Sequence, residues 1–322
     1  MSALDSLRRL GSSRRPAWLG PLIALLVVYV VFAIITPEHS FLRPQNLPMM
    51  GRQTVVVAIC ALGMTLVIVT GGIDLSTGSL VALTTVIIAR LLKSGSSPVF
   101  AVICGVAVAA AVGAAIGLFV GRLRMMPFVV TLGAMTALRG VAKGLAAEQK
   151  IDCDPRGLDR LLDASFSSPG IWLALALALA IAVLLDYTRF GRHVLAVGSN
   201  EAAATLCGIN AARVKILVYA LSSMLAGIAG IMEFSTLTVG DPTDSFGLEL
   251  EVIAAVVIGG APLSGGEGSI VGSVLGALLM TVIRTGAVHM GMPSWVQEIV
   301  TGVIIFVAVA IDRARRPRGR AS

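Results

Sequence analysis

The stretch Thr70-Gly71-Gly72-Ile73-Asp74-Leu75-Ser76 separates two strongly apolar runs, residues 54–70 and 76–92. It brings two adjacent glycines and a carboxylate to a place where a continuous membrane helix would carry apolar side chains. Glycine weakens a helix interior, and an acidic residue at membrane depth is costly unless it has a special role. The stretch therefore predicts a break between two apolar helices, of the kind found in transporters with discontinuous helices.

The composition around this break is that of a membrane protein. Of the 322 residues, 56% are apolar and only 13% are charged, and the mean hydropathy is +0.91. Soluble domains have about 45–50% apolar and about 25% charged residues, and disordered chains are poorer still in apolar residues. The 35 glycines and the aromatic share of 5% favour close approach of helices over bulky surfaces. A soluble globular enzyme and a disordered chain are both excluded.

Apolar runs continue along the whole chain and define the predicted fold. At about 20 residues per crossing, the length allows on the order of eight to eleven helices and no sizeable soluble domain. The run at residues 248–261 is short and suits a re-entrant or broken helix better than a full span. We expect an all-α, polytopic transmembrane bundle of about ten helices. The ten runs lie at residues 17–36, 54–70, 76–92, 98–121, 127–145, 170–187, 214–234, 248–261, 269–288 and 295–311.

The net charge of +7 reflects the membrane topology, because Lys and Arg lie mainly outside the apolar runs. Arginines flank both the first and the last run, so by the positive-inside rule both ends are cytoplasmic and the number of crossings is even. This predicts cytoplasmic tails at residues 1–16 and 312–322 around a permease domain at 17–311, a cytoplasmic loop at 188–213, and location in the inner membrane. No nucleic-acid partner is expected.

The broken stretch has a second copy in the chain. Thr70–Ser76, followed by Gly78-Ser79-Leu80-Val81, resembles Ile258-Gly259-Gly260-Ala261-Pro262-Leu263-Ser264, followed by Gly268-Ser269-Ile270-Val271. Both copies lie where an apolar run ends on a glycine pair, which suggests an internal repeat with broken helices at the Gly-Gly motifs. A chance match in a glycine-rich chain is the alternative, and the sequence leaves open whether the repeat is parallel or inverted.

Candidate pathway residues follow from these breaks. Asp74 is the only ionisable residue between Gln53 and Arg90, which makes it a functional candidate within the membrane. A structural role is equally supported, because Asp74 or Ser76 could cap the following helix. The pathway candidates are Gly71, Gly72, Asp74, Ser76, Gly259, Gly260 and Ser264.

The cytoplasmic segment Gly198–Ile209 predicts a short helix. Asn200 is a good N-cap, Glu201 complements the helix dipole, three alanines favour helix, and Gly208 is a natural terminator. Such a two-turn helix is unstable by itself in water and needs a partner surface. The alternative, a helix lying on the lipid, is weaker because the small alanine face would bury little area.

Signatures of catalysis are missing from the sequence. The phosphate-binding loop of ATPases needs a Gly-Lys pair, and the chain has none. The four cysteines and three histidines are scattered, without metal-ligand spacing. We expect a transport subunit without metal or cofactor, and any ATP hydrolysis on a separate polypeptide.

Together these motifs resemble the ribose/xylose-type permease family of bacterial ABC importers, over residues 20 to 312. The resemblance implies two permeases, a second copy or a related one, in the inner-membrane lipid, with cytoplasmic ATP-binding subunits and a periplasmic sugar-binding protein. It also implies that the loop docks into the ATPase through Asn200, Glu201, Ala202, Ala203 and Gly208. The motifs that carry it are Gly71–Ser79, Thr131-Leu132-Gly133, Leu138-Arg139-Gly140, Gly198–Ala203, Ile253–Gly260 and Leu263–Gly266.

The predicted function is half of a transmembrane pathway for a monosaccharide. The outside loop at residues 146–169 departs from the ribose-type pattern, which leaves the sugar open. The alternative is an ion- or proton-coupled secondary transporter, with Asp74 or Glu233 as the carrier within broken helices.

Overall fold

The computed structural model describes residues 18–163 and 165–315 of the chain. The predicted tail at residues 1–16 lies outside this part, as do residues 316–322 of the predicted C-terminal tail. The described chain is a helical bundle with one short β-ribbon, in which β1 (Ile151–Asp152) pairs antiparallel with β2 (Val239–Gly240). Two short 3-10 helices, η1 (Pro37–Leu42) and η2 (Leu158–Leu161), lie in connections.

The predicted all-α membrane bundle is confirmed, but the number of about ten helices is not. The described residues form twelve α-helices, since the loop at 188–213 contains two helices besides those of the ten apolar runs. The helices are α2 (Leu19–Ile35), α3 (Asn46–Val69), α4 (Thr77–Lys93), α5 (Pro98–Gly121), α6 (Pro127–Leu145), α7 (Pro169–Tyr187), α8 (Arg189–Ser199), α9 (Glu201–Leu206), α10 (Ala211–Leu237), α11 (Leu248–Ile258), α12 (Ile270–His289) and α13 (Ser294–Arg315).

Among the described residues, six helices are long and apolar enough to cross a membrane: α3, α5, α6, α7, α10 and α12. Of these, α3 is the central helix, because its residues from Thr54 to Val69 are all buried. By contrast, α11 has only 11 residues. At 1.5 Å per residue it rises about 16 Å, roughly half of a hydrocarbon core of about 30 Å. This length fits the broken helix expected for the run at 248–261.

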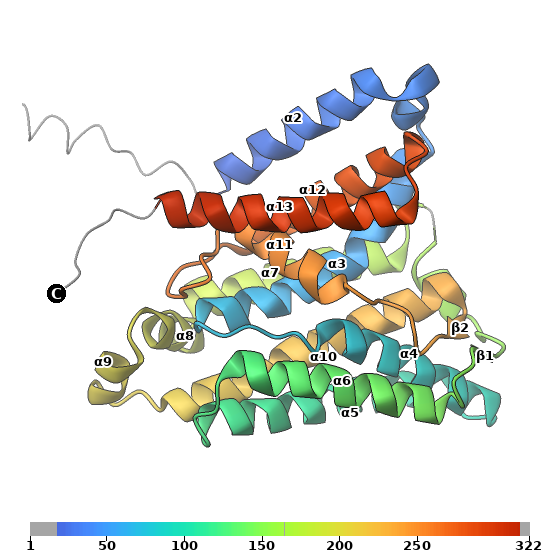
Figure 1. Cartoon of the computed structure of the whole chain (residues 1–322). Coiled ribbons are helices and arrows are strands. Elements are labelled where there is room, and N and C mark those ends of the chain that lie inside the picture. Colours follow the sequence, from blue (N-terminus) through green and yellow to red (C-terminus); the bar gives the residue numbers. More distant parts are fainter. Residues whose placement is uncertain (1–17, 164, 316–322) are drawn as a thin grey trace, which may run out of the picture.

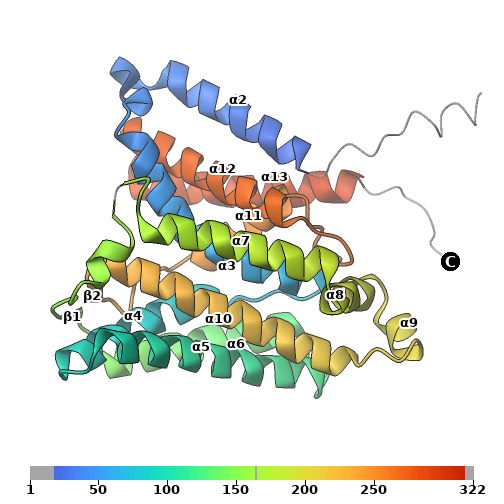
Figure 2. The ribbon, with the colours of Figure 1, turned by 180° about the vertical axis from the view of Figure 1, so that it is seen from behind.

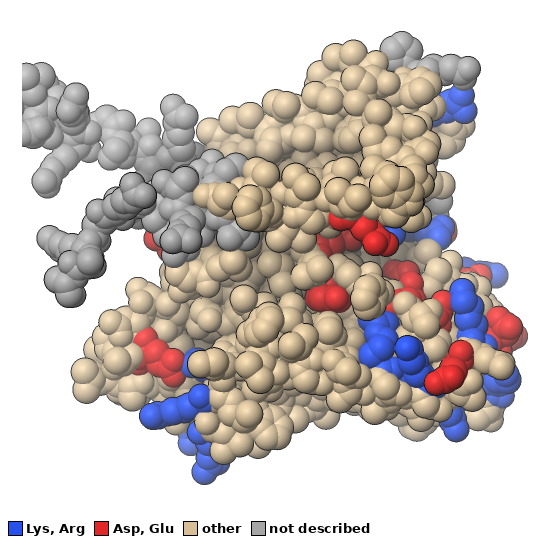
Figure 3. All heavy atoms as spheres, viewed as in Figure 1, with Lys and Arg blue, Asp and Glu red and all other residues tan. Residues whose placement is uncertain are grey.

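The bundle has two distinct ends (Figures 1 and 2). One end, here called the α9 end, holds α8 and α9 together with the start of α2 and the end of α13. The opposite end, here called the ribbon end, holds β1 and β2. On the face shown in Figure 3, Lys and Arg side chains gather toward both ends of the bundle, and a few carboxylates lie between them.

Two helices begin inside the bundle instead of at its ends (Figure 1). After α3 reaches the α9 end, residues 70–76 return into the bundle and α4 starts there. After α10 reaches the ribbon end, residues 241–247 return into the bundle and α11 starts there. Because α3 and α10 run in opposite directions, these two broken units are inverted relative to each other.

The sequence repeat does not coincide with this inverted pair. Gly71-Gly72 follows α3 and precedes the broken helix α4, whereas Gly259-Gly260 follows the broken helix α11. Both glycine pairs end a helix in the same way, with a left-handed glycine at φ +78 (Gly71) or +97 (Gly260). In each, the next amide bonds back to the helix, Gly72 N to Val67 O at 3.0 Å and Ala261 N to Val256 O at 3.1 Å. The similarity is therefore that of a shared helix-ending motif.

Glycine also allows α5 and α10 to pack with their backbones in contact. A Cβ added at Gly117 would lie 2.6 Å from Ile216 Cα, and one at Gly121 would lie 2.7 Å from Ala212 O. Small residues are the usual means of bringing membrane helices together, because the bilayer provides no hydrophobic drive for helix association. The two helices lie side by side in both views (Figures 1 and 2).

Candidate functional site

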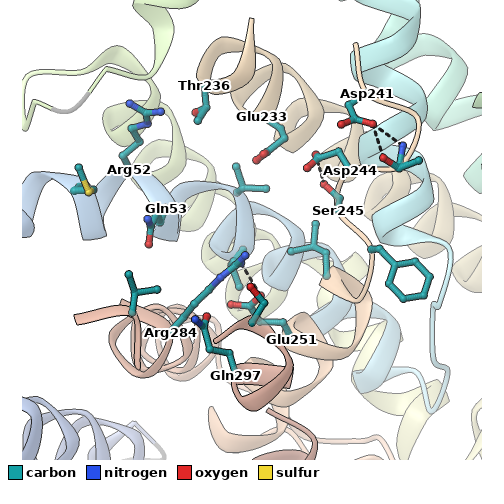
Figure 4. Close-up of a pocket in the computed structure, with 18 residues that line it drawn as sticks. Arg52, Gln53, Glu233, Thr236, Asp241, Asp244, Ser245, Glu251, Arg284 and Gln297 are labelled. Atoms are coloured by element: carbon teal, nitrogen blue, oxygen red, sulfur yellow. Dashed lines mark hydrogen bonds and ion pairs between the residues drawn. The ribbon is translucent and has the colours of Figure 1, made fainter. Parts of the chain in front are cut away.

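A polar hollow of ≈ 830 Å³ lies between α3, α10, α11, α12, α13 and the segment that leads into α11 (Figure 4). Its volume falls in the range of about 300–1,000 Å³ that is typical of small-molecule sites. The polar residues that Figure 4 labels along it are Arg52, Gln53, Glu233, Thr236, Asp241, Asp244, Ser245, Glu251, Arg284 and Gln297.

The hollow carries more negative than positive side chains, four carboxylates against two guanidinium groups. Arg284 Nη1 lies 3.7 Å from Glu251 Oε2, and the Arg284 side chain is 66% exposed while that of Glu251 is 13% exposed. Glu233 comes from α10 on the other side of the hollow (Figure 4). The lining thus offers donors and acceptors for hydroxyl groups and disfavours an anionic solute.

The rim of the hollow is anchored to the loop at residues 146–169. Asp241 accepts hydrogen bonds from Thr243 N at 2.8 Å and from Thr243 Oγ1 at 2.7 Å, and it pairs with Lys150 Nζ at 3.0 Å. Burial acts to raise the pKa of Asp241, but these hydrogen bonds and the Lys150 charge outweigh it and hold the pKa below its usual value. With the adjacent β1–β2 pair, this contact fixes the start of the lead-in segment.

Helix α6 holds the same segment from another side. Arg139 Nη1 donates to Pro242 O at 3.1 Å and to Asp244 O. Arg139 lies within an apolar run, and the contacts found for its side chain in the described structure are hydrogen bonds to backbone carbonyls. These bonds satisfy carbonyls that an extended segment inside the bundle would otherwise leave without donors.

The starts of α4 and α11 meet inside the bundle. A Cβ at Gly78, in the first turn of α4, would overlap the Glu249 carboxylate and lie 2.5 Å from Ser245 O. Glu249 lies in the first turn of α11 and is buried. Because helix starts carry partial positive charge, two such starts stabilise a buried carboxylate placed between them.

Asp74 is fully buried and shapes the turn before α4. Its Oδ1 accepts hydrogen bonds from Ser76 N at 2.9 Å and from Ser76 Oγ at 2.6 Å. Its Oδ2 has no hydrogen-bond partner among the described residues. Neither Asp74 nor Ser76 lines the hollow, so these contacts favour the structural role over the pathway role.

The glycine candidates lie together at the α9 end and not in the hollow. A Cβ at Gly265 would lie 2.7 Å from Gly71 N, and one at Gly71 would lie 3.8 Å from Ser264 O. Gly259 packs equally closely on Gly272 of α12, with 2.7 Å from its Cβ position to Gly272 O. The structure therefore brings the first glycine pair next to Ser264 and assigns Gly259 to helix packing.

The predicted helix in the 188–213 loop is present as α9. Asn200 Oδ1 accepts from Ala203 N at 2.9 Å, as expected of an N-cap. At the other end Gly208 has φ +84, and Ile209 N bonds back to Ala204 O at 3.0 Å. Glu201 and the alanines that follow it, Ala202 and Ala203, are exposed, so this face of the loop is available to a partner.

The sequence pointed only partly to the hollow. Glu233, Glu251 and Arg284 are ionisable residues within the apolar runs at 214–234, 248–261 and 269–288. Arg52 and Asp241 gave no such signal, because each lies just outside a run and nothing local shows which side chains meet. In the described part of the chain no group of three or more His, Cys, Asp or Glu could hold a metal ion.

Comparison of the chain with known proteins identifies its family. The model of a family described as branched-chain amino acid transport system / permease component matches residues 49–309. The ribose import permease protein RbsC of Bacillus subtilis (strain 168) is 38% identical over 306 residues, which cover 92% of this chain and 93% of the relative. RbsC of Escherichia coli (strain K12) is 39% identical over 312 residues, with 93% and 96% covered.

A third relative, the L-arabinose ABC transporter permease protein AraH of Azospirillum brasilense, is 33% identical over 304 residues, which cover 94% of this chain and 89% of the relative. No solved structure matches the chain. The relatives are transport components and not enzymes. The chain belongs to the ABC importer permease family that the model describes, among its sugar import permeases, and is a multi-pass protein of the inner membrane.

Proposed function

We propose that the chain forms half of the pathway through which an ABC importer moves a neutral monosaccharide. The observation that carries this proposal is the polar hollow, which extends into the bundle from the ribbon end. The family implies a periplasmic binding protein that delivers substrate and a separate subunit that hydrolyses ATP.

The ribbon end faces the periplasm in this proposal, and both termini are cytoplasmic. Support comes from the start of α2 and the end of α13, which lie at the α9 end (Figure 1). It comes also from the basic residues in the connections and helix ends at that end, as the positive-inside rule expects. These residues are Arg122, Arg124, Arg189, Arg192, Arg213 and Lys215. The permease domain then comprises residues 17–311.

The chemistry of the hollow favours a sugar over a branched-chain amino acid. Twelve of its eighteen lining residues are polar or charged. A branched aliphatic side chain would need a mainly apolar wall, whereas the hydroxyls of a sugar can use carboxylate, guanidinium and amide groups. The excess of carboxylates also disfavours phosphorylated sugars. Ribose and L-arabinose, named in the relatives, are the first candidates to test.

The ATPase subunit docks on α9 in this proposal, through Asn200, Glu201, Ala202, Ala203 and Gly208. The helix protrudes at the α9 end, and its residue Leu206 is 90% exposed. A short helix with an exposed leucine needs a partner to cover it. The pathway is completed by a second copy of the chain or a related permease, and the remaining apolar outer surfaces contact lipid.

Sugar uptake tests the proposal in cells that express the chain with its ATPase and binding protein. Radiolabelled ribose and arabinose should accumulate, and accumulation should stop when ATP is depleted while the membrane potential is kept. Uptake that collapses with an uncoupler but survives ATP depletion would instead support the secondary transporter. Competition by leucine but not by sugars would overturn the proposed substrate class.

A further inference from the structure

An ion pair joins α9 to the first turns of α10. Lys215 Nζ lies 2.6 Å from Glu201 Oε2, across 14 residues of sequence. The Lys215 side chain is only 15% exposed, whereas that of Glu201 is 49% exposed. A mostly buried ammonium group needs a partner, because burying an unpaired charge is costly. Glu201 provides that partner, so it has a contact within its own chain.

Lys215 also borders the break that follows α3. It lines a small cavity of ≈ 20 Å³ together with Thr70, Gly71, Gly72 and Tyr219. A space of this size holds about one water molecule. The side chain that anchors α9 therefore lies beside the Gly71-Gly72 pair, from which the chain turns back toward α4.

Tyr219 makes the contact with this glycine pair. It lies four residues after Lys215, on the same face of α10, and it is fully buried. A Cβ at Gly72 would lie 2.5 Å from the Tyr219 hydroxyl oxygen, so the hydroxyl occupies the space that a side chain at Gly72 would need. A shift of α10 along its axis would press this hydroxyl against the break or withdraw it.

The neighbouring helix gives this part of α10 a firm support. Gly117 and Gly121 of α5 contact the α10 backbone at Ile216 and Ala212, with 2.6 Å and 2.7 Å from the glycine Cβ positions. Backbones in direct contact have no side chains between them that could absorb a movement. A displacement of α9 is thus expected to move α10 and α5 as one body.

We propose that Lys215 is a positioning residue that passes the movement of α9 to the Gly71-Gly72 break. Glu201 holds α9 on Lys215, and Tyr219, one turn along α10, packs against Gly72. The inference rests on the proposed function, and it assigns the Glu201 carboxylate a role within its own chain as well as next to the ATPase. The effect to measure is therefore the amount of sugar moved per ATP hydrolysed, not folding alone.

Charge reversal and exchange test this assignment. Proteoliposomes would contain Glu201→Lys, Lys215→Glu or both, assembled with the wild-type ATPase and binding protein, and sugar uptake and phosphate release would be measured together. Each single reversal should lower the sugar-to-ATP ratio about tenfold, and the exchanged pair should return to within about threefold of wild type, because coupled residues are not additive. Arg213→Glu is the matched control for Lys215→Glu, because Arg213 is an exposed residue of the same helix and the change of charge is the same. Its sugar-to-ATP ratio should stay within about twofold of wild type.

An exchanged pair that stays as low as the single reversals would overturn the inference, as would an equal loss in Arg213→Glu. If the reversals do not assemble, Glu201→Gln and Lys215→Met give the second test. Glu201→Gln should lower the ratio in the wild-type background and have no further effect beside Lys215→Met, since no ammonium is then left unpaired. Additive losses would contradict the pairing. Absence of ATP-dependent uptake by the wild-type complex would reject the proposed function itself.

Discussion

The α9 end and the hollow use opposite kinds of packing. At the α9 end, backbone meets backbone: Gly198 of α8 lies against Val69 O, and Gly266 N donates to the same carbonyl at 2.9 Å. The hollow is instead lined by long polar side chains around ≈ 830 Å³ (Figure 4). Direct backbone contact passes movement on without rearrangement, whereas side chains can adjust around a solute. In the proposed function, this contrast lets one end transmit motion and the other accommodate substrate.

Gly198→Ala should have the largest effect, because it alters the backbone contact between α8 and α3. The new Cβ would overlap Val69 O, so α8 and α3 must separate, at a cost of about 1–3 kcal/mol. Thermal unfolding in detergent should show a lower melting temperature and transport should be lost. Gly140→Ala, on α6 with nothing within 4 Å of its Cβ position, is the control and should unfold like wild type. Equal melting temperatures for the two variants would show that the contact at Gly198 accommodates a methyl group without loss of stability.

Asp74→Ala should cost about 1–2 kcal/mol of stability, because the turn before α4 loses both hydrogen bonds from Ser76. Asp74→Asn keeps an acceptor oxygen and should melt close to wild type. If Asp74 is structural, Asp74→Asn also retains transport to within about threefold. Loss of transport in a well-folded Asp74→Asn protein would restore the ion-carrier alternative.

Glu251→Gln should lower sugar uptake about tenfold without destabilising the fold. It removes the partner of Arg284, whose side chain is 66% exposed, so the free energy of unfolding should change by less than about 1 kcal/mol. The change in rate follows from the altered hydrogen bonding in the hollow. Glu267→Gln, at the α9 end, is the control for loss of one carboxylate. A matching decrease there would mean that the hollow has no special part in transport.

The smallest effect is expected from Asp241→Asn at the rim. The folded pKa of Asp241 is below its usual value, so its ion pair stabilises the fold above the unfolded pKa of about 4. This contribution is lost as pH falls through the folded pKa. The free energy of unfolding of wild type should therefore exceed that of Asp241→Asn at pH 7 by less than about 1 kcal/mol, and this difference should shrink as the pH falls below about 4. A difference that persists in acid would exclude the ion pair as its cause.

Residue preferences and apolar patterns predicted those parts of the structure that are determined by residues near each other in sequence. The caps of α9 at Asn200 and Gly208 follow from residue preferences within a few positions, and each apolar run became a helix. The hollow could not be predicted in this way, because it joins Arg52 and Glu251 from helices that are far apart in sequence. Which helix faces contact each other depends on packing between helices. The apolar composition of the runs does not predict this packing.

The glycine repeat shows how a local motif can be mistaken for a larger symmetry. Gly71-Gly72 and Gly259-Gly260 resemble each other because both end a helix with the same hydrogen bonds. The broken units that the structure relates by inversion, α3–α4 and α10–α11, do not share the glycine pair. What their lead-in segments share is shorter: Asp74 and Asp241 each accept hydrogen bonds from the amide and the hydroxyl of the residue two positions on.

The most direct test of the different roles proposed for the α9 end and the hollow is the sugar-to-ATP ratio of two variants. Both are measured in the same kind of proteoliposome preparation with ATPase and binding protein. Glu201→Lys, at the α9 end, should let ATP hydrolysis continue while sugar uptake falls, so the ratio drops about tenfold. Glu251→Gln, in the hollow, should slow uptake and hydrolysis together and leave the ratio near that of wild type. Equal ratios in both variants, or a lower ratio in Glu251→Gln alone, would contradict the account.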